Sequence, residues 1–241
     1  MSQSIQTFPS WGRKIVAIGR NFAYVQTPRI PCPCPNTETF NSEHAKELGN
    51  AVPTAPFFFL KPTSSYVSST SVDARIEIPK GTNVHHEIEL GVVIGRTGRD
   101  IAASEAMHFV EGYALAIDVT ARDLQDAAKK SGKPWTTAKG FDTFTPVGEF
   151  LPKSLIANPD DLRLWLKING ETKQDGPTSD MIFKIPDLIA YVSAITTLER
   201  GDVILTGTPA GVGKLIPGDT VTCGLAKRGN NGGDIFNMSF R

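Results

Sequence analysis

The segment Asn83–Gly95, with the sequence NVHHEIELGVVIG, places acidic residues in the alternating pattern of a β-strand. Successive side chains of a strand point to opposite faces, so Glu87 and Glu89 share one face. The apolar residues of the segment alternate onto the other face: Ile88, Leu90, Val92 and Ile94. We therefore expect one face to be core and the other to carry chemistry.

Two carboxylates at this spacing repel each other, and holding both ionised is costly unless a cation or protons compensate the charge. The pair indicates either a cation-binding strand or a solvated edge strand whose glutamates face water. A zinc site is a further interpretation, with His85 on the glutamate face and His86 on the other. In the simpler reading, one histidine orients a carboxylate and the other packs.

A second predicted strand carries a single acid among small residues. In GYALAIDVTARD the alternation places Asp118 and Thr120 on the same face as two alanines, opposite an apolar face. If this strand lies near the Glu87 strand, three carboxylates converge. An oxygen-only set suits a hard cation, so the sequence predicts Mg²⁺, with Mn²⁺ or Ca²⁺ as alternatives.

Two other segments hold candidate functional residues. Lys139 follows PWTTA, and it is either a surface lysine or, near a metal-bound carbonyl and with a lowered pKa, a proton donor or acceptor. LTGTPAGVG lacks the G-K-[ST] ending of a phosphate loop and precedes no helical pattern, which argues against nucleotide binding. The backbone donors of such a turn can bind a carboxylate substrate, and Thr208 is the candidate contact.

The composition narrows the class of protein. The chain has 241 residues, and its 25 Lys plus Arg balance 25 Asp plus Glu, so it lacks the basic character typical of proteins that bind nucleic acid or anionic membranes. No apolar run approaches the ~20 residues of a membrane span. Three cysteines, an odd number, indicate a reducing compartment. We expect a soluble protein that acts on a small molecule or binds a protein partner.

Short β-patterns broken by Gly and Pro turns predict a β-rich α+β fold with few helices. The predicted strands lie in KIVAIG, PFFFLKP, ARIEIP, HHEIELGVVIG, GYALAIDVT, DLRLWLKING, DVILTG, DTVTCGL and DIFNMSF. TARDLQDAAKKSG predicts a helix that Thr120 caps and Gly132 ends. PDLIAYVSAIT predicts a second helix with one apolar stripe, made of Leu188, Tyr191, Val192 and Ile195.

The length fits one catalytic domain spanning residues 1–241. Residues 1–13 are interpreted as a targeting segment or a disordered tail, because no acidic residue appears before Glu38, as is typical of mitochondrial presequences. The composition alone leaves the location open; the mitochondrial matrix is expected, with the cytoplasm as the alternative. Residues 25–43 have no hydrophobic period and predict an inserted lid loop.

Several segments together resemble the fumarylacetoacetate hydrolase family, in particular its small mitochondrial acylpyruvase, oxaloacetate decarboxylase and oxaloacetate tautomerase branch. They are GRNFA, FFFLKPTSS, HHEIELGVVIG, YALAIDVTARDLQ, GKPWTTAKGFDTFTPVG, KIPDLIAYVS and LERGDVILTGTPAGVG, and they cover nearly the whole chain from Lys14 onward. The resemblance implies a mixed β-sandwich or β-roll, a homodimer, and Mg²⁺ held by Glu87, Glu89 and Asp118.

The resemblance also implies roles for residues around the cation. Lys139 matches a catalytic lysine of the family. Positions that line the substrate pocket of the family correspond here to Arg20, Gln125 and Thr208, and Arg122 is a further candidate.

The lid departs from the family pattern. The family has its lid histidine four residues after the Asn of GRN, where this chain has Val25. A similar sequence, HAKEL, arrives only after a 19-residue insertion at 25–43. The catalytic roles of the lid pair are therefore assigned to His44 and Glu47, which share one face if this piece is helical.

The implied chemistry is that of a metal-bound enolate formed from oxaloacetate or a related 2,4-dioxo acid. Proton movement at C3 gives enol–keto tautomerisation, loss of the distal carboxylate gives decarboxylation, and water attack on a distal carbonyl gives acylpyruvate hydrolysis. We expect tautomerisation first, because it requires only the cation and a proton shuttle such as Lys139 or the His44 and Glu47 pair. Decarboxylation is expected second and acylpyruvate cleavage third. The alternatives are a non-catalytic Mg²⁺-dependent dicarboxylate-binding protein and a structural protein whose acidic strands face solvent.

Overall fold

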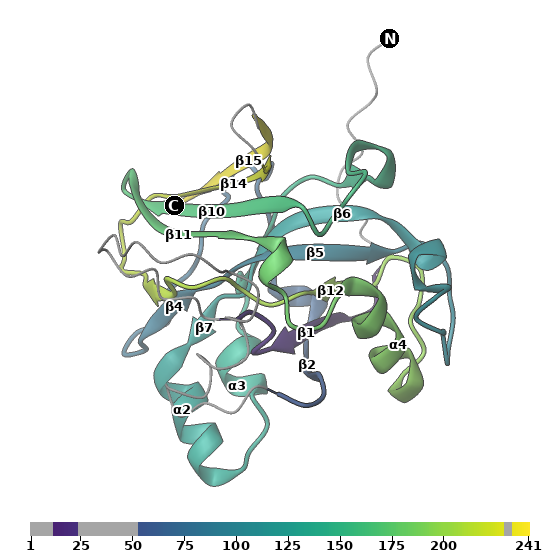
Figure 1. The fold of residues 1–241 in the computed structure, drawn as a ribbon. Coiled ribbons are helices and arrows are strands. Elements are labelled where there is room, and N and C mark those ends of the chain that lie inside the picture. The colour runs from purple at the N-terminus through teal and green to yellow at the C-terminus, as the bar shows by residue number, and fades with distance from the viewer. Residues whose placement is uncertain (1–11, 24–52, 229–232) are drawn as a thin grey trace, which may run out of the picture.

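A computed structural model describes residues 12–23, 53–228 and 233–241. Within them, strands form two large sheets and one small sheet, accompanied by three α-helices (Figure 1). The prediction of a β-rich α+β fold with few helices is confirmed. Residues 1–11 of the predicted tail, the lid loop at 25–43, His44 and Glu47 lie outside the described residues.

The largest sheet has eight strands and mixed pairing. Its strands are β1 (Ile15–Gly19), β2 (Phe57–Lys61), β3 (Tyr66–Ser68), β5 (Ile88–Ile94), β6 (Val110–Ile117), β8 (Thr145–Val147), β9 (Leu151–Pro152) and β12 (Val203–Leu205). Their order is β2-β1-β12-β5-β6-β8-β3, and β9 also pairs with β6. The β1–β12 and β3–β8 pairs are parallel, and the other pairs are antiparallel.

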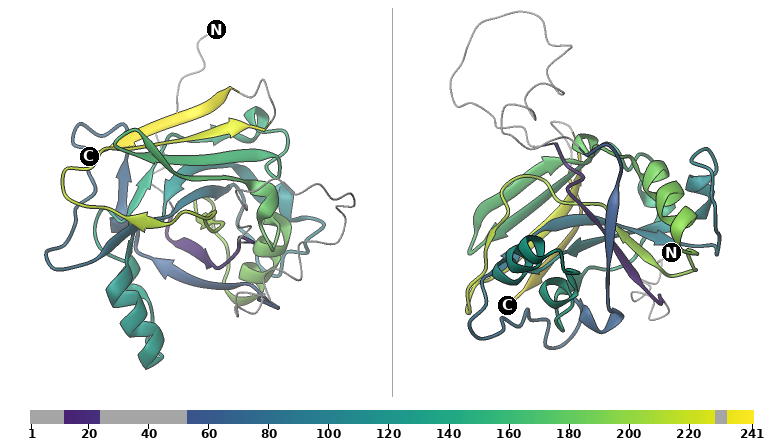
Figure 2. Two further views of the ribbon diagram at one scale, coloured as in Figure 1. Left: turned by 60° about the vertical axis from the view of Figure 1, so that its left-hand side comes forward. Right: turned by 90° about the horizontal axis from the view of Figure 1, so that it is seen from below.

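A second sheet lies over one face of the first (Figure 2). It is antiparallel, in the order β11 (Glu171–Pro177), β10 (Leu162–Ile168), β14 (Val221–Lys227) and β15 (Asp234–Phe240). A small third sheet joins β13 (Gly213–Lys214), β4 (Val84–His86) and β7 (Thr120–Ala121). The α-helices are α2 (Arg122–Ser131), α3 (Thr136–Lys139) and α4 (Ile185–Ile195), and the 3₁₀ turns are η1 (Thr63–Ser65), η2 (Ala106–Phe109), η3 (Lys153–Leu155) and η4 (Thr178–Asp180).

The main apolar core lies between the two large sheets, where β10 contacts β5. The face of β5 that the sequence predicts to be apolar is fully buried there, together with residues of β10 and β14: Ile88, Leu90, Val92, Ile94, Leu164, Leu166 and Leu225. The alternation of β6 is also confirmed, because Tyr113 and Leu115 join this core while Ala114 and Ala116 pack in a separate cluster. Removal of this apolar surface from water is the main force that joins the sheets.

The helices differ from the sequence prediction in two details. Thr120 does not cap α2, because Ala121 occupies the N-cap position and the Thr120 hydroxyl donates to Glu87 instead. Gly132 ends this helix as predicted, in the left-handed conformation with φ 63°. In α4, Ile195 is exposed rather than buried, because it lies in the last turn, beyond the buried stripe of Ile185, Leu188, Ile189 and Val192.

Two strand predictions also need correction. ARIEIP, residues 74–79, forms no strand, although the backbone N–H of Ile76 donates to the carbonyl of Arg241. The pattern does not predict β11, whose sequence ETKQDGP is polar. Because β11 is an edge strand with mostly exposed side chains, it has no apolar alternation to detect.

No helix in the described ranges combines the length and apolar character needed to cross a membrane.

A buried carboxylate ties the start of β1 to the turn before β12. Asp202 is fully buried, and its carboxylate accepts hydrogen bonds from the backbone N–H groups of Arg13, Lys14 and Glu199. The same carboxylate lies 2.5 Å from Nζ of Lys14. Because β1 and β12 are parallel neighbours, this ion pair helps to set their register.

We expect Asp202→Ala to lower the free energy of unfolding by roughly 3–5 kcal/mol, because it leaves three N–H groups without their acceptor and removes the nearer carboxylate partner of the largely buried Lys14 ammonium, whose other partner is Glu199 at 3.5 Å. Urea unfolding followed by circular dichroism measures this loss. Glu171→Ala is the control, since it removes only an exposed ion pair with Lys173 and should cost less than about 1 kcal/mol. Equal losses in the two variants would contradict the role given to Asp202.

Candidate metal centre

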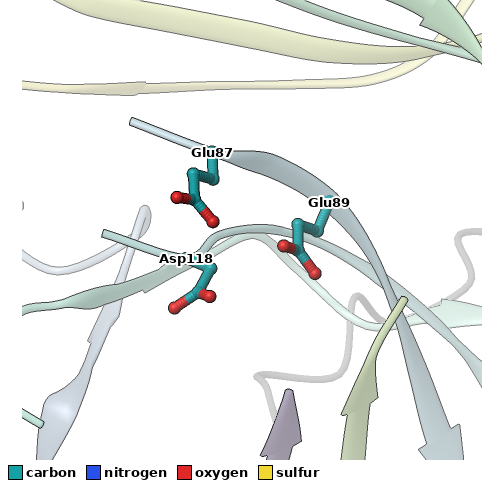
Figure 3. A group of neighbouring side chains, drawn as sticks. All are labelled: Glu87, Glu89 and Asp118. Carbon is teal, nitrogen blue, oxygen red and sulfur yellow. The ribbon is translucent and has the colours of Figure 1, made fainter. Parts of the chain in front are cut away.

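Three carboxylates meet where β4 ends, β5 begins and β6 ends (Figure 3). Glu87 lies between β4 and β5, Glu89 lies in β5, and Asp118 directly follows β6. One oxygen of each carboxylate lies within 4.8 Å of the other two. Their exposed fractions are 9%, 1% and 2%, respectively. The structure thus brings together the three acids that the sequence singles out, and the interpretation of glutamates facing solvent is wrong.

Strand pairing explains why these side chains meet. The backbone N–H of Asp118 donates to the carbonyl of Glu87 at 2.8 Å, which places the two residues side by side. Glu89 lies opposite Ala116 in the β5–β6 register. The small side chain of Ala116 leaves room for the carboxylate of Glu89, as the pattern of alanines predicts.

Cationic side chains compensate two of the three carboxylates. Nζ of Lys139 lies 3.0 Å from Oε2 of Glu87 and 2.5 Å from Oδ2 of Asp118. Nζ of Lys61 lies 2.5 Å from Oδ1 of Asp118 and donates to the carbonyl of Phe144 at 2.7 Å. The guanidinium of Arg122 donates to Oε1 of Glu87. The neighbourhood of Glu87 and Asp118 is therefore rich in positive charge.

Glu89 is placed differently. It accepts the backbone N–H of Gly207 at 2.7 Å, and no lysine or arginine within the described ranges pairs with it. Burial raises the pKa of Glu89 well above its usual range, and the negative charges of Asp118 and Glu87 raise it further. Lys139 and the Gly207 N–H offset this only in part. The centre therefore contains one buried carboxylate whose charge lacks a side-chain counterion.

The two lysines experience opposite net effects. Burial lowers the pKa of Lys139, but the carboxylates of Asp118 and Glu87 outweigh it, so that this pKa is raised. Burial also lowers the pKa of Lys61, the charge of Lys139 lowers it further, and the carboxylates of Asp118 and Glu89 do not offset these effects. The expectation of a lowered pKa for Lys139 is therefore wrong, because two carboxylates rather than one hold its ammonium.

The donor set fits a hard divalent cation. All the converging atoms are carboxylate oxygens, which Mg²⁺, Mn²⁺ and Ca²⁺ prefer. Burial and the neighbouring carboxylates disfavour the ionised form of Glu89, and such a cation would compensate its charge. The zinc alternative is not supported within the described residues, because the cluster contains no histidine. Nδ1 of His86 instead forms a hydrogen bond with Gln174.

The residues predicted to line a substrate pocket occupy different positions. Arg122 and Gln125 lie in the first turn of α2, where NH1 of Arg122 donates to Oε1 of Gln125 at 2.6 Å. Thr208 follows β12, and its hydroxyl donates to the carbonyl of Ile88 at 2.8 Å. Arg20 is exposed at the end of β1 with φ 56°, and no contact with the carboxylates is seen in the described part of the chain.

Sequence reasoning did not identify three residues that shape this centre. Lys61 ends the strand FFFLK and is only 2% exposed, but a lysine after an aromatic run does not reveal in the sequence that it is buried. Gly207 acts through its backbone N–H, which no residue type reveals. Gln174 belongs to β11, whose polar sequence shows no strand pattern and so gives no sign that Gln174 is buried.

The sequence of this chain is similar to those of known proteins. Residues 14–235 match the family model described as fumarylacetoacetate (FAA) hydrolase C-terminal. The chain is 51% identical over 226 residues to the mitochondrial oxaloacetate tautomerase FAHD2 of Oryza sativa subsp. japonica, covering 93% of this chain and 92% of that relative. It is 50% identical to the mitochondrial oxaloacetate decarboxylase of Dictyostelium discoideum, covering 89% of each chain.

A solved structure gives the same result at the level of the fold. The crystal structure of fumarylpyruvate hydrolase from Pseudomonas aeruginosa, in complex with Mn²⁺ and pyruvate, has a TM-score of 0.78 and 32% sequence identity to this chain. The match covers 99% of this chain and 91% of that chain. The family resemblance and the fold type that it implies are confirmed: this chain belongs to the fumarylacetoacetate hydrolase family.

Proposed function

We propose that this protein is a mitochondrial, Mg²⁺-dependent oxaloacetate tautomerase, which interconverts the enol and keto forms of oxaloacetate. Relatives about half identical in sequence carry the names oxaloacetate tautomerase and oxaloacetate decarboxylase, and these names include the mitochondrial location. The Mn²⁺ and pyruvate of the related crystal structure support a divalent cation and a 2-oxo acid as ligands. A homodimer remains a prediction from the family resemblance.

One observation carries the proposal: a buried, oxygen-only carboxylate cluster lies in direct contact with a buried lysine ammonium. A protein that only binds a dicarboxylate requires the cluster and a cation. Enol–keto exchange also requires a group that carries a proton at the same place, and Lys139 is in position to do so. This contact favours an enzyme over the non-catalytic binding protein.

Glu87, Glu89 and Asp118 are the residues that would hold the cation. When bound there, it supplies positive charge that stabilises the enolate of a 2-oxo acid. Arg122 and the Gly207 N–H orient the carboxylates of Glu87 and Glu89 through the hydrogen bonds described above. Because these donors are fixed by the fold, little reorganisation is needed when substrate arrives.

Tautomerisation moves one proton between the enol oxygen and C3 and breaks no bond between heavy atoms. Lys139 donates a proton from Nζ to C3 and takes one back from the enol hydroxyl, so that it ends the cycle protonated. Lys61 and Lys139 hold the two oxygens of Asp118 from separate sides and fix its orientation. The charge on Lys139 also favours an anionic substrate near it.

Decarboxylation is a second candidate activity, favoured by the name of the Dictyostelium relative. It would start from the same bound substrate but release the distal carboxylate as CO₂, and C3 of the remaining pyruvate enolate would then take up a proton. Acylpyruvate hydrolysis would additionally need an activated water. His44 and Glu47, which lie outside the described residues, remain predicted catalytic residues and an alternative proton shuttle to Lys139.

Lys139→Met tests the proton carrier. We expect kcat for oxaloacetate tautomerisation, followed by the enol absorbance with and without Mg²⁺, to fall by roughly 10²–10⁴-fold, because the variant cannot move a proton. Lys133→Met, at an exposed lysine of the same segment, is the matched control and should retain activity. Undiminished turnover in Lys139→Met would remove the assigned role, and a wild-type protein that binds Mg²⁺ without turnover would indicate the dicarboxylate-binding alternative.

Glu89→Gln tests the metal centre through binding rather than turnover. The variant keeps the shape of the side chain but removes one ligand charge, so Mg²⁺ affinity measured by calorimetry should fall by about tenfold or more. Without cation, the variant should melt no lower than the wild type, because the lost charge has no described cationic partner. Glu77→Gln, at an exposed glutamate, should leave Mg²⁺ binding unchanged.

The result that would contradict this assignment is Mg²⁺ binding by Glu89→Gln with the affinity of the wild type. Melting curves give an independent readout. Mg²⁺ should raise the melting temperature of the wild type and of Glu77→Gln, because a ligand stabilises the state that binds it. It should raise that of Glu89→Gln much less.

A further inference from the structure

Ile88 lies between Glu87 and Glu89, so its peptide groups help to set the direction of both carboxylates. On one side of Ile88 the backbone pairs with β6. On the other side, β12 ends its pairing at Leu205, which lies opposite Gly91. The pairing of β5 with β12 therefore ends before the segment that carries Glu87 and Glu89. Other groups must hydrogen-bond to the backbone of this segment on that side.

Gln174 of β11 takes the place of the missing strand. Its Oε1 accepts the backbone N–H of Ile88 at 3.0 Å, and its Nε2 donates to the hydroxyl of Thr208 at 2.8 Å. That hydroxyl in turn donates to the carbonyl of Ile88 at 2.8 Å. Gln174 and Thr208 thereby satisfy both backbone polar groups of Ile88 on the open side of β5.

The orientation of the Gln174 amide follows from its partners. The carbonyl of Pro209 can only accept a hydrogen bond and the N–H of Ile88 can only donate one, so Nε2 must face the former and Oε1 the latter. Oε1 also accepts from Nδ1 of His86 at 2.8 Å. The amide is fully buried, and these four contacts use its two donor hydrogens and two acceptor positions.

The loop after β12 also approaches the backbone of β11 closely. A Cβ atom on Gly176 would lie 2.6 Å from Cβ of Pro209. A Cβ atom on Gly211, which has φ +97°, would lie 2.0 Å from the carbonyl oxygen of Lys173. Two glycines therefore allow the loop and β11 to touch on both sides of Gln174, in contacts that a larger residue would prevent.

We infer that Gln174 is a positioning residue of the metal centre. It clamps the segment that carries Glu87 and Glu89 against the loop that carries Gly207 and Thr208. It contacts none of the three carboxylates and acts through Ile88 and Thr208. The kinetic consequence of this clamp rests on the proposed function, whereas its consequence for metal binding rests on the carboxylate centre alone.

Gln174→Met tests the clamp, because methionine has a similar length but forms none of the four hydrogen bonds. We expect Mn²⁺ affinity, measured by calorimetry, to fall by about 10- to 100-fold, as is typical when a partner beyond the ligands is lost. We also expect a lower kcat for oxaloacetate tautomerisation. Thr178→Val is the matched control, because it removes a buried hydroxyl that bonds the backbone of Leu162 in the same sheet, away from the centre.

Thr178→Val should lower the melting temperature but leave Mn²⁺ affinity and kcat within about twofold of the wild type, since independent sites act separately. If both variants weaken Mn²⁺ binding equally at equal loss of melting temperature, Gln174 has only a general structural role and the inference is overturned. Wild-type Mn²⁺ affinity in folded Gln174→Met would overturn it as well.

Gln174→Glu keeps the test decisive if the methionine variant does not fold. Ionised glutamate can still accept from Ile88 and His86, but it has no donor for Thr208 and Pro209. We expect a raised KM together with weaker Mn²⁺ binding, and unchanged values of both would overturn the inference. If the wild type binds Mn²⁺ but does not tautomerise oxaloacetate, the proposed function fails, while the Mn²⁺ affinities still decide the role of Gln174.

Discussion

The structure depends on the cost of burying three carboxylates within reach of one another. Glu87, Glu89 and Asp118 would repel strongly in a region from which water is excluded, so the fold must supply positive charge nearby. Lys61, Lys139 and Arg122 supply it for two of the acids. Each of these cations comes from a different element, β2, α3 or α2, so the electrostatics of the centre link distant parts of the chain.

The second constraint is geometric. Ligands at i and i+2 of a strand need a straight, well-held backbone, yet this pair lies where the main sheet loses a neighbouring strand. The loop after β12 and the amide of Gln174 complete the missing edge. The four-stranded sheet is thus more than a cover for the apolar core, since one of its edge residues supports the centre through Ile88 and Thr208.

Local patterns were sufficient to predict the acids and the strands that carry them. Alternation in β5 and β6 separates the apolar face from the acidic one, and it depends only on neighbours in sequence. Partners from distant segments were not predictable in this way. Lys61 resembles the end of any strand until the fold brings it to Asp118, and the pKa of Lys139 depends on two carboxylates from other elements. The assignment of His44 and Glu47 remains a prediction.

Gly207 constrains how this protein can be re-engineered. Its φ of +96° and its close approach to Asn21 oppose any side chain at this position. Gly207 contributes a main-chain N–H that donates to Glu89. Replacing Gly207 with another residue cannot adjust this hydrogen bond without first displacing the loop. Directed evolution toward other oxo acids must therefore leave Gly207 fixed and find its variation among side chains elsewhere around the carboxylates.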